Sequence, residues 1–325
     1  MWRFYTVPKV GEPRSETWKG TALALGAGGG ATWMTGTYDP EIDTLFWGAG
    51  NPYPAINGDD RQGDNLYSAS VLALKPDVGE LKWYYQFTPH DTHDWDAGQT
   101  PMVVDTRYRG QDRKLLIQAN RNGFIYVFDR TNGELLVAEK FVDKVSWASG
   151  IGKDGRPILL PGADPTREGN KACPNVLGGT NWMSMSYNPG TRLFYLQTLE
   201  ACGIYVKPPE WNPKKLFLEP GQKFLRAIDI ETGKRVWEVP QIGPADSWGG
   251  VISTAGGVVF FGEDSGAFAA VDASTGKDLW QIQTNASAEL GDGHSWRASP
   301  MTFMAGGKQY VAVAAGPNIL CFGLP

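Results

Sequence analysis

The chain has 325 residues, 42% of them hydrophobic and 20% charged, which is typical of a globular protein with material for one large domain or two ordinary ones. Its formal net charge of −5 argues against a nucleic-acid partner, because such proteins carry a basic excess that displaces counterions. No run of about 18 apolar residues occurs, so we expect no membrane-spanning helix. Residues 1–5 lack the pattern of a secretion signal.

Short apolar runs predict strands along the whole chain. They cover residues 45–47, 115–117, 124–128, 193–196, 258–261 and 310–314. The 41 glycines and 22 prolines form turns and interrupt helices, so many short strands and no long helix are expected. Three further stretches are irregular and too long for turns, and we expect them to be loops on the face where sites usually lie. They are residues 138–180, 204–224 and 284–299.

A strand–turn–strand repeat recurs among these runs. Residues 227–237 and 270–280 match at Ala, Asp, Thr, Gly, Lys and Trp, and 73–83 and 127–137 are looser copies, the last with Val137 in place of the tryptophan. In each copy a glycine takes the turn position that needs a positive φ. The tryptophan four residues later is suited to packing between neighbouring units.

The repeat predicts the fold. Many short strands with a repeat of about 40 to 60 residues are typical of an all-β protein of the β-propeller type. We count roughly five units, fewer than a comfortable closed ring. Met1 and Trp2 resemble the end of a repeat, so the chain is expected to start at the end of a blade. We therefore expect one partial propeller domain over residues 1–325.

Five motifs stand in order on this framework. They are Thr32-Trp33 with Tyr38-Asp39-Pro40; Gly48-Ala49-Gly50-Asn51-Pro52 with Gly63-Asp64-Asn65; Thr88-Pro89-His90-Asp91-Thr92-His93-Asp94-Trp95-Asp96; Asn120-Arg121-Asn122-Gly123; and Ser247-Trp248-Gly249-Gly250. With them the sequence resembles the pyrroloquinoline quinone (PQQ)-dependent alcohol dehydrogenases, whose eight-bladed propellers carry tryptophan-docking motifs. The resemblance covers essentially the whole chain, and roughly the last three-fifths of a full-length member.

The resemblance implies oxidation of a primary alcohol to an aldehyde, with hydride transfer to PQQ. Asp94 occupies the position of the family's catalytic base, and Arg121 that of the arginine bonded to the reactive quinone oxygen. Without the resemblance, Asp94 would be read as a turn aspartate and Arg121 as a surface arginine in a hairpin.

The implied metal ligands are Asn51, Asp94 and Asp96, which offer oxygens to a hard cation. Asp96 matches an extra aspartate of lanthanide-using members, but some calcium- or magnesium-using relatives also carry Asp-x-Asp, so Ca²⁺ and a lanthanide both remain open. The family's glutamate ligand and its pair of adjacent cysteines lie in N-terminal blades that we expect this chain to lack. We therefore expect the chain to be inactive alone.

The remaining matches concern the cofactor and the cysteines. Trp33 matches the ring beneath the quinone, and Asn181 and Trp248 match contacts to its edge, although each could instead serve blade packing. The three cysteines show no CxxC spacing, which excludes zinc-finger and haem-attachment motifs. Cys173 and Cys202 are the natural pair for one disulfide and match a structural disulfide of the family. Cys321 is expected to be a buried small apolar residue.

The resemblance also implies a periplasmic enzyme that takes a small alcohol and passes electrons to a cytochrome c or a quinone; a homo-oligomer is possible. The alternative is a noncatalytic propeller that serves as a scaffold or binding module in bacterial envelope assembly. A scaffold has no reason to retain Asn51, Asp94 and Arg121 together, and this retention favours the enzyme.

Overall fold

The computed structural model describes residues 1–24, 26, 28–208, 219–245, 247–283, 296–316 and 318–323. Throughout these residues the regular structure is β, apart from one 3-10 turn, η1 (Ser15–Thr17), which confirms the all-β prediction. No helix in the described ranges is long and apolar enough to cross a membrane. The chain divides into two compact units. Unit 1 is Met1–Trp182 with Ala201–Glu219, and unit 2 is Met183–Glu200 with Pro220–Pro325.

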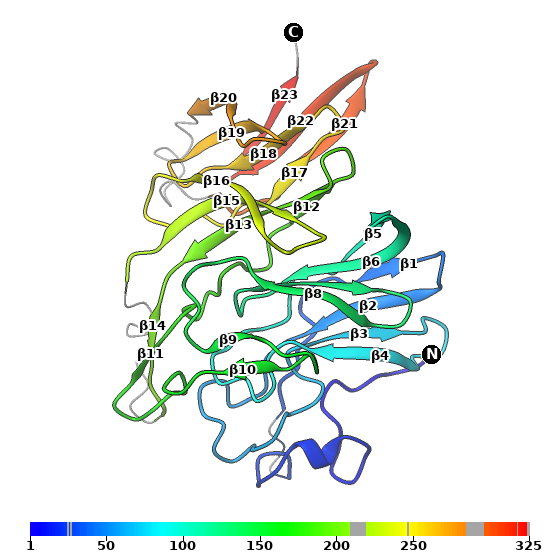
Figure 1. Cartoon of the computed structure of the whole chain (residues 1–325), viewed down its shortest axis with the longest axis vertical. Helices are drawn as coiled ribbons and strands as arrows, with labels where there is room; N and C mark the ends of the chain where they lie inside the picture. Colours follow the sequence, from blue (N-terminus) through cyan, green and yellow to red (C-terminus); the bar gives the residue numbers. More distant parts are fainter. Residues whose placement is uncertain are drawn as a thin grey trace. The chain divides into compact units, whose positions relative to one another are not determined.

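Unit 1 contains two four-stranded antiparallel sheets of consecutive strands (Figure 1). The first comprises β1 (Thr37–Asp39), β2 (Thr44–Ala49), β3 (Ser70–Leu74) and β4 (Leu81–Gln86). The second comprises β5 (Met102–Tyr108), β6 (Gln111–Ala119), β7 (Phe124–Asp129) and β8 (Glu134–Lys140). Two short strand pairs follow: β9 (Ala148–Ile151) with β10 (Pro157–Leu159), and β11 (Asn170–Ala172) with β14 (Gly203–Tyr205).

Unit 2 contains three sheets built in the same manner, and its last sheet has three described strands. The first comprises β12 (Ser186–Asn188), β13 (Leu193–Glu200), β15 (Gln222–Asp229) and β16 (Arg235–Pro240). The second comprises β17 (Val251–Ser253), β18 (Val258–Gly262), β19 (Ala267–Asp272) and β20 (Asp278–Gln283). The third comprises β21 (Met301–Ala305), β22 (Lys308–Ala315) and β23 (Asn318–Gly323).

The long irregular stretches are less bare of structure than predicted. Residues 138–180 contain β9 to β11. Gly155, with φ of 78°, lies in the tight turn that joins β9 to β10. The stretch 204–224 includes parts of β14 and β15, and its residues 209–218 lie outside the described residues. Residues 284–295 of the third predicted loop lie outside them as well.

The repeat folds as the sequence predicts, with tryptophan rings docked on turn glycines. Trp2, Trp83 and Trp237 lie over Gly79, Gly133 and Gly276, where an added Cβ would meet a ring atom at 2.2, 2.7 and 2.6 Å. The same glycines have φ between 70° and 80°. Each indole Nε1 donates to a backbone oxygen of the same turn, those of Pro76, Arg130 and Ala273. Glycine is therefore required at these turns by both backbone conformation and ring contact.

The core of unit 1 is rich in aromatic side chains. The rings of Phe87 and Tyr126 lie 4.8 Å apart, those of Tyr85 and Phe128 4.9 Å apart, and Phe87, Tyr126 and Phe128 are fully buried. All five residues of β3 are buried, as expected for a strand whose sheet is covered on both faces. This rigid core supports the loops that follow β2, β4 and β6.

The prediction for Cys321 is wrong, because this residue is exposed. The register of the last sheet explains its position. Leu320 and Phe322 of β23 stand opposite Val313 and Val311 of β22 and belong to the buried cluster around Phe268. Alternation along the strand places Cys321 on the other face.

Candidate active site

The loops after β2, β4 and β6 carry the predicted site residues of unit 1. Asn51 follows β2, Asp94 and Asp96 lie between β4 and β5, and Arg121 lies in the turn between β6 and β7. Trp33 precedes β1. Loops at strand ends can hold functional side chains because the sheets beneath them are rigid.

Asp96 joins two of these loops. Its Oδ1 accepts the backbone N–H of Asn51 at 2.7 Å, and its Oδ2 accepts Nη1 of Arg121 at 2.7 Å. The ion pair is largely buried, with side-chain exposures of 9% for Arg121 and 13% for Asp96. Gly50 makes the approach possible, since a Cβ there would lie 2.5 Å from Oδ1. The structure therefore brings Asn51, Asp96 and Arg121 into direct contact.

Arg121 is held from a second side as well. Its Nη2 donates to the carbonyl of Val176 at 2.8 Å, and Gly178 packs so closely on Arg121 that a Cβ would clash with its backbone. The buried Nε has no hydrogen-bond partner among the described residues. The planar guanidinium is thus held from two sides, and its Nε–H is left without a partner in the described part of the chain.

The Asp94 carboxyl accepts no hydrogen bond from the described part of the chain, and its backbone has the unusual φ of 62°. Burial raises the pKa of Asp94 to about 7, with the nearby Asp96 and Asp91 acting in the same direction and the Arg121 charge opposing them. An unpartnered carboxyl with a pKa near neutrality is suited to accept a proton or to bind a cation.

Asn51 offers a free amide oxygen. Its Nδ2 donates to the carbonyl of Pro52 at 2.9 Å, and no donor among the described residues reaches its Oδ1. Amide and carboxylate oxygens, such as those of Asn51, Asp94 and Asp96, are the ligand types that a hard cation prefers. The described residues contain no group of three or more His, Cys, Asp or Glu arranged for a metal ion; the predicted set has two carboxylates and an amide.

The three residues predicted to contact the cofactor differ in environment. Trp33 is 47% exposed, and its ring borders Gly98. Asn181 is buried and satisfied locally: its Nδ2 donates to Leu177 O at 2.8 Å, and its Oδ1 accepts Trp182 N at 2.9 Å. The amide of Asn181 is therefore committed to its own turn.

Trp248 belongs to unit 2. It is buried, and Nζ of Lys223 lies 3.6 Å from the centroid of its ring. Its backbone N–H donates to Trp296 O at 2.6 Å.

Several residues that support the site were not predicted from sequence. Asp91 and His93 lie within the third motif, residues 88–96. The spacing Asp91-x-x-Asp94 is the one sequence signal that could have identified Asp91 as a second carboxylate near the site. Arg61 is fully buried and bonds to several backbone carbonyls. A lone arginine in a loop gives no sequence signal of such burial.

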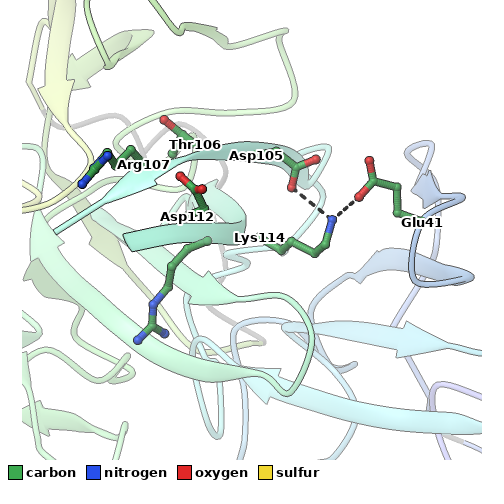
Figure 2. A pocket seen from close by; sticks show the side chains of 7 residues that line it. Glu41, Asp105, Thr106, Arg107, Asp112 and Lys114 are labelled. Carbon is green, nitrogen blue, oxygen red and sulfur yellow. Dashed lines mark hydrogen bonds and ion pairs between the residues drawn. The ribbon is translucent and has the colours of Figure 1, made fainter. Parts of the chain in front are cut away.

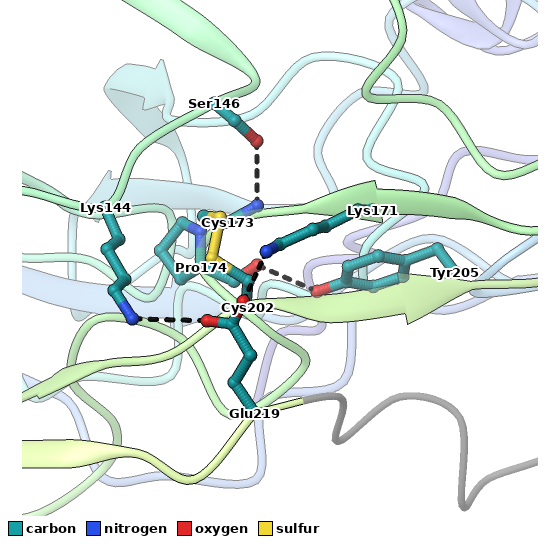
Figure 3. The surroundings of a disulfide bond; sticks show 8 residues. All are labelled: Lys144, Ser146, Lys171, Cys173, Pro174, Cys202, Tyr205 and Glu219. Atoms are coloured by element: carbon teal, nitrogen blue, oxygen red, sulfur yellow. Dashed lines mark hydrogen bonds and ion pairs between the residues drawn. A yellow bond between two sulfur atoms is a disulfide. The ribbon is translucent and has the colours of Figure 1, made fainter.

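The predicted disulfide Cys173–Cys202 is present (Figure 3). The backbone N–H of Cys173 donates to Ser146 Oγ at 2.8 Å. Close by, Glu219 forms ion pairs with Lys144 and Lys171. Cys173 lies just before Asn175 and Val176 in the chain. The carbonyls of these two residues accept hydrogen bonds from Trp95 and Arg121, respectively. The disulfide therefore anchors a segment that contacts the site.

A cavity of about 430 Å³ lies on the β5–β6 hairpin (Figure 2). Its lining is charged, and Lys114 bridges the carboxylates of Glu41 and Asp105. It is lined by Glu41, Asp105, Thr106, Arg107, Asp112, Arg113 and Lys114. None of the predicted site residues lines it, so it is separate from the cluster around Asp94.

Comparison with known proteins identifies the family. The family model described as the glucose/ethanol/alcohol dehydrogenase β-propeller domain matches residues 1–147. Quinoprotein alcohol dehydrogenase PedH of Pseudomonas putida is 40% identical over 94% of this chain. The lanthanide-dependent methanol dehydrogenase of Methylorubrum extorquens is 35% identical over 93% of it. The chain belongs to the quinoprotein alcohol dehydrogenase family.

The solved structures agree with this assignment. The quinohemoprotein alcohol dehydrogenase ADHIIG from Pseudomonas putida superposes on 98% of this chain with a TM-score of 0.86 and 34% identity. The chain spans about half the length of its relatives, 52% of PedH and 50% of ADHIIG. A second model, described as outer membrane protein assembly factor BamB, matches residues 196–324.

Proposed function

We propose that this chain carries the catalytic base and part of the cofactor site of a PQQ-dependent dehydrogenase, which oxidises a primary alcohol to an aldehyde. The observation that carries the proposal is the half-buried Asp94 carboxyl, which lacks a hydrogen-bond partner among the described residues and lies in the field of Arg121 and Asp96. We further propose that residues 1–325 form one partial propeller domain.

The residues present fit the two groups that such an enzyme needs. Asn51, Asp94 and Asp96 would supply oxygens for Ca²⁺ or a lanthanide ion, and Trp33 and Arg121 would hold the quinone. The Asn181 amide is engaged in its own turn, and Trp248 belongs to unit 2. The free Nε of Arg121 and the free Oδ1 of Asn51 are unused polar atoms of the kind that a bound group satisfies. When bound, PQQ accepts the hydride and the cation polarises its carbonyl.

The chain itself handles the proton and the charge. Asp94 accepts the alcohol proton on a carboxylate oxygen, and its pKa near 7 lets it do so around neutral pH. Arg121 places a permanent positive charge beside the atom on which negative charge develops. Asp96 orients Arg121 through the 2.7 Å ion pair. The largely buried setting keeps water from competing for these groups.

We infer a periplasmic location, since disulfides such as Cys173–Cys202 persist in oxidising compartments. We further propose a cytochrome c or a quinone as the electron acceptor. The chain alone is expected to turn over no alcohol, because the resemblance assigns a glutamate metal ligand to the part of the relatives outside the matched half.

The test is a chimera of this chain with the unmatched half of PedH. Loaded with PQQ and either Ca²⁺ or La³⁺, it should reduce an electron-accepting dye when given a primary alcohol. Omission of PQQ or of the cation should abolish the reaction. A folded chimera that binds PQQ but oxidises no primary alcohol would contradict the proposal.

The second candidate is a noncatalytic scaffold of the bacterial envelope, and the BamB model match over residues 196–324 favours it. That match covers the part of the chain that contains Trp248 but none of Asn51, Asp94 and Arg121. A scaffold function would be indicated if the chain bound envelope proteins while the chimera stayed inactive.

A further inference from the structure

Asp91 is a carboxylate that the proposed reaction does not use, and it is buried to 1% exposure. Its Oδ1 accepts the backbone N–H of His93 at 2.9 Å, and its Oδ2 accepts that of Trp95 at 2.8 Å. The two bonds fall on the residues that flank Asp94. The backbone of Asp94 is thus clamped on both sides by one side chain.

The clamp is needed because Asp94 adopts a left-handed conformation, with φ of 62°. A residue other than glycine keeps such a conformation only where its surroundings impose it. Here the surroundings also fix both flanking side chains. The His93 and Trp95 rings stack at 4.3 Å with an interplanar angle of 12°.

Those two rings are anchored at their far ends. Nε2 of His93 lies 2.9 Å from Ala163 O, and Nε1 of Trp95 donates to Asn175 O at 3.0 Å. With both neighbours held in the core, the only side chain of this trio left to face the site is the half-buried Asp94.

Arg61 connects the clamp to the loop that carries Asn51. This fully buried arginine donates Nη2 to Asp91 O at 2.7 Å and to Pro54 O at 2.7 Å, and Nη1 to Asn65 Oδ1 at 2.8 Å. The Arg61 guanidinium therefore hydrogen-bonds both to the segment after Asn51 and to the loop that carries Asp94.

We propose that Asp91 is a positioning residue that sets the Asp94 carboxyl in its reactive place by bonding the backbone on both sides of it. This inference rests on the proposed role of Asp94 as base. Both oxygens of Asp91 must be acceptors. An asparagine has one acceptor oxygen and would turn an NH₂ group toward one of the two N–H donors.

The test compares Asp91→Asn with Asp272→Asn. Asp272 also caps a turn, but both of its backbone donors, Ser274 N and Thr275 N, bond to the same Oδ1, so asparagine can replace it. Hydrogen exchange by mass spectrometry on the 325-residue chain should show at least tenfold faster exchange at residues 92–97 in Asp91→Asn. Asp272→Asn should leave that segment unchanged.

The same variants in the PedH chimera give the catalytic readout. Asp91→Asn should lower kcat about a hundredfold, the effect of a misplaced catalytic group, with the KM for alcohol within about threefold of wild type. Asp272→Asn should keep kcat within about twofold. Faster hydrogen exchange throughout β6 and β7 would show that Asp91→Asn does not fold. Asp91→Ser then replaces it in the exchange and turnover measurements, because the serine hydroxyl offers one neutral acceptor.

Two results would overturn the inference: unchanged exchange at residues 92–97, or an active chimera in which Asp91→Asn retains kcat within about twofold of wild type. An inactive wild-type chimera would instead reject the proposed function, and the exchange measurement alone would then decide whether Asp91 holds this loop.

Discussion

Asp94 and Asp96 are two carboxylates two positions apart in different environments. Asp96 is bonded to Arg121 and to the Asn51 backbone, whereas Asp94 is half-buried without a hydrogen-bond partner among the described residues. Burial therefore favours the protonated form of Asp94 and raises its pKa to about 7. This difference gives the pair separate roles and a measurable pH signature.

The signature appears in the stability of the metal-free chain. The pKa of Asp94 in the folded chain lies above its unfolded value near 4. Between about pH 4 and 7 the carboxyl is therefore protonated in the folded chain and ionised in the unfolded chain. Because the folded state binds more protons, the wild type loses stability as the pH rises through this window. Asp94→Asn should remove this loss and exceed wild type by about 2 to 4 kcal/mol at pH 8.

Urea unfolding of both proteins in EDTA at several pH values tests this. The difference between their unfolding free energies should grow from pH 4 to 7 and then level off. Parallel pH profiles would show that Asp94 is not perturbed in this way.

Cation binding should depend on the charge of Asp96. La³⁺ and Ca²⁺ should each raise the melting temperature of the chain, since a ligand that binds only the folded state stabilises it. Asp96→Ala should diminish the La³⁺ effect more than the Ca²⁺ effect, because it removes one negative charge from the donor set. Differential scanning fluorimetry measures these shifts in melting temperature. Asp112→Ala, which removes a carboxylate from the separate cavity on the β5–β6 hairpin, is the control. An equal loss for both ions would refute a role for Asp96 in metal selection.

At the scale of elements, the tryptophan-docked turn is the recurring unit of both compact units. Trp237 lies over Gly276 and donates to Ala273 O at 3.1 Å. The recurring tryptophan predicted packing between neighbouring units, but not the turn that each ring contacts. The copy with Val137 supplies no docking ring of its own, but its β7–β8 turn at Gly133 still receives the ring of Trp83.

Alanine at two glycines separates ring docking from backbone strain. Gly276 has φ of 72° and a ring atom 2.6 Å from its added Cβ, while Gly257 has φ of 79° and nothing within 4 Å. Gly276→Ala should cost about 3 kcal/mol and Gly257→Ala about 1 kcal/mol, because only the former displaces Trp237. Equal losses in urea unfolding would show that the ring contact contributes nothing.

The sequence predicted the site only in part. The motifs named Asn51, Asp94 and Arg121 as candidates, and each of them lies in a loop after a strand. The three long stretches that the sequence predicted to carry sites contain none of these residues. The Asp96–Arg121 ion pair and the burial of Arg61 could not be predicted. Both depend on which loops lie next to each other in space, and that is a property of sheet packing rather than of local sequence.

At the scale of the whole molecule, the last sheet exposes an apolar face. Met301 of β21 pairs with Ala312 of β22, which pairs in turn with Cys321 of β23. On this face Met301 is 56% exposed and Ile319 is 78% exposed. The other face of this sheet is packed in the core of unit 2. A sheet that is apolar on both faces promotes association.

We therefore expect the isolated chain to self-associate in light scattering. Met301→Lys should reduce this association, while Leu159→Lys, at an exposed position of unit 1, should not. A stable monomer at high concentration, with no effect of Met301→Lys, would contradict the prediction.

The turnover of the PedH chimera carrying Asp94→Asn measures most directly whether Asp94 is the catalytic base. An amide cannot accept the alcohol proton, yet it keeps the shape of the side chain and an oxygen for the cation. Alcohol-dependent dye reduction should fall about a thousandfold, while PQQ binding, followed by the absorbance of the bound cofactor, stays close to that of the parent. Turnover equal to that of the parent chimera would show that Asp94 is not the base.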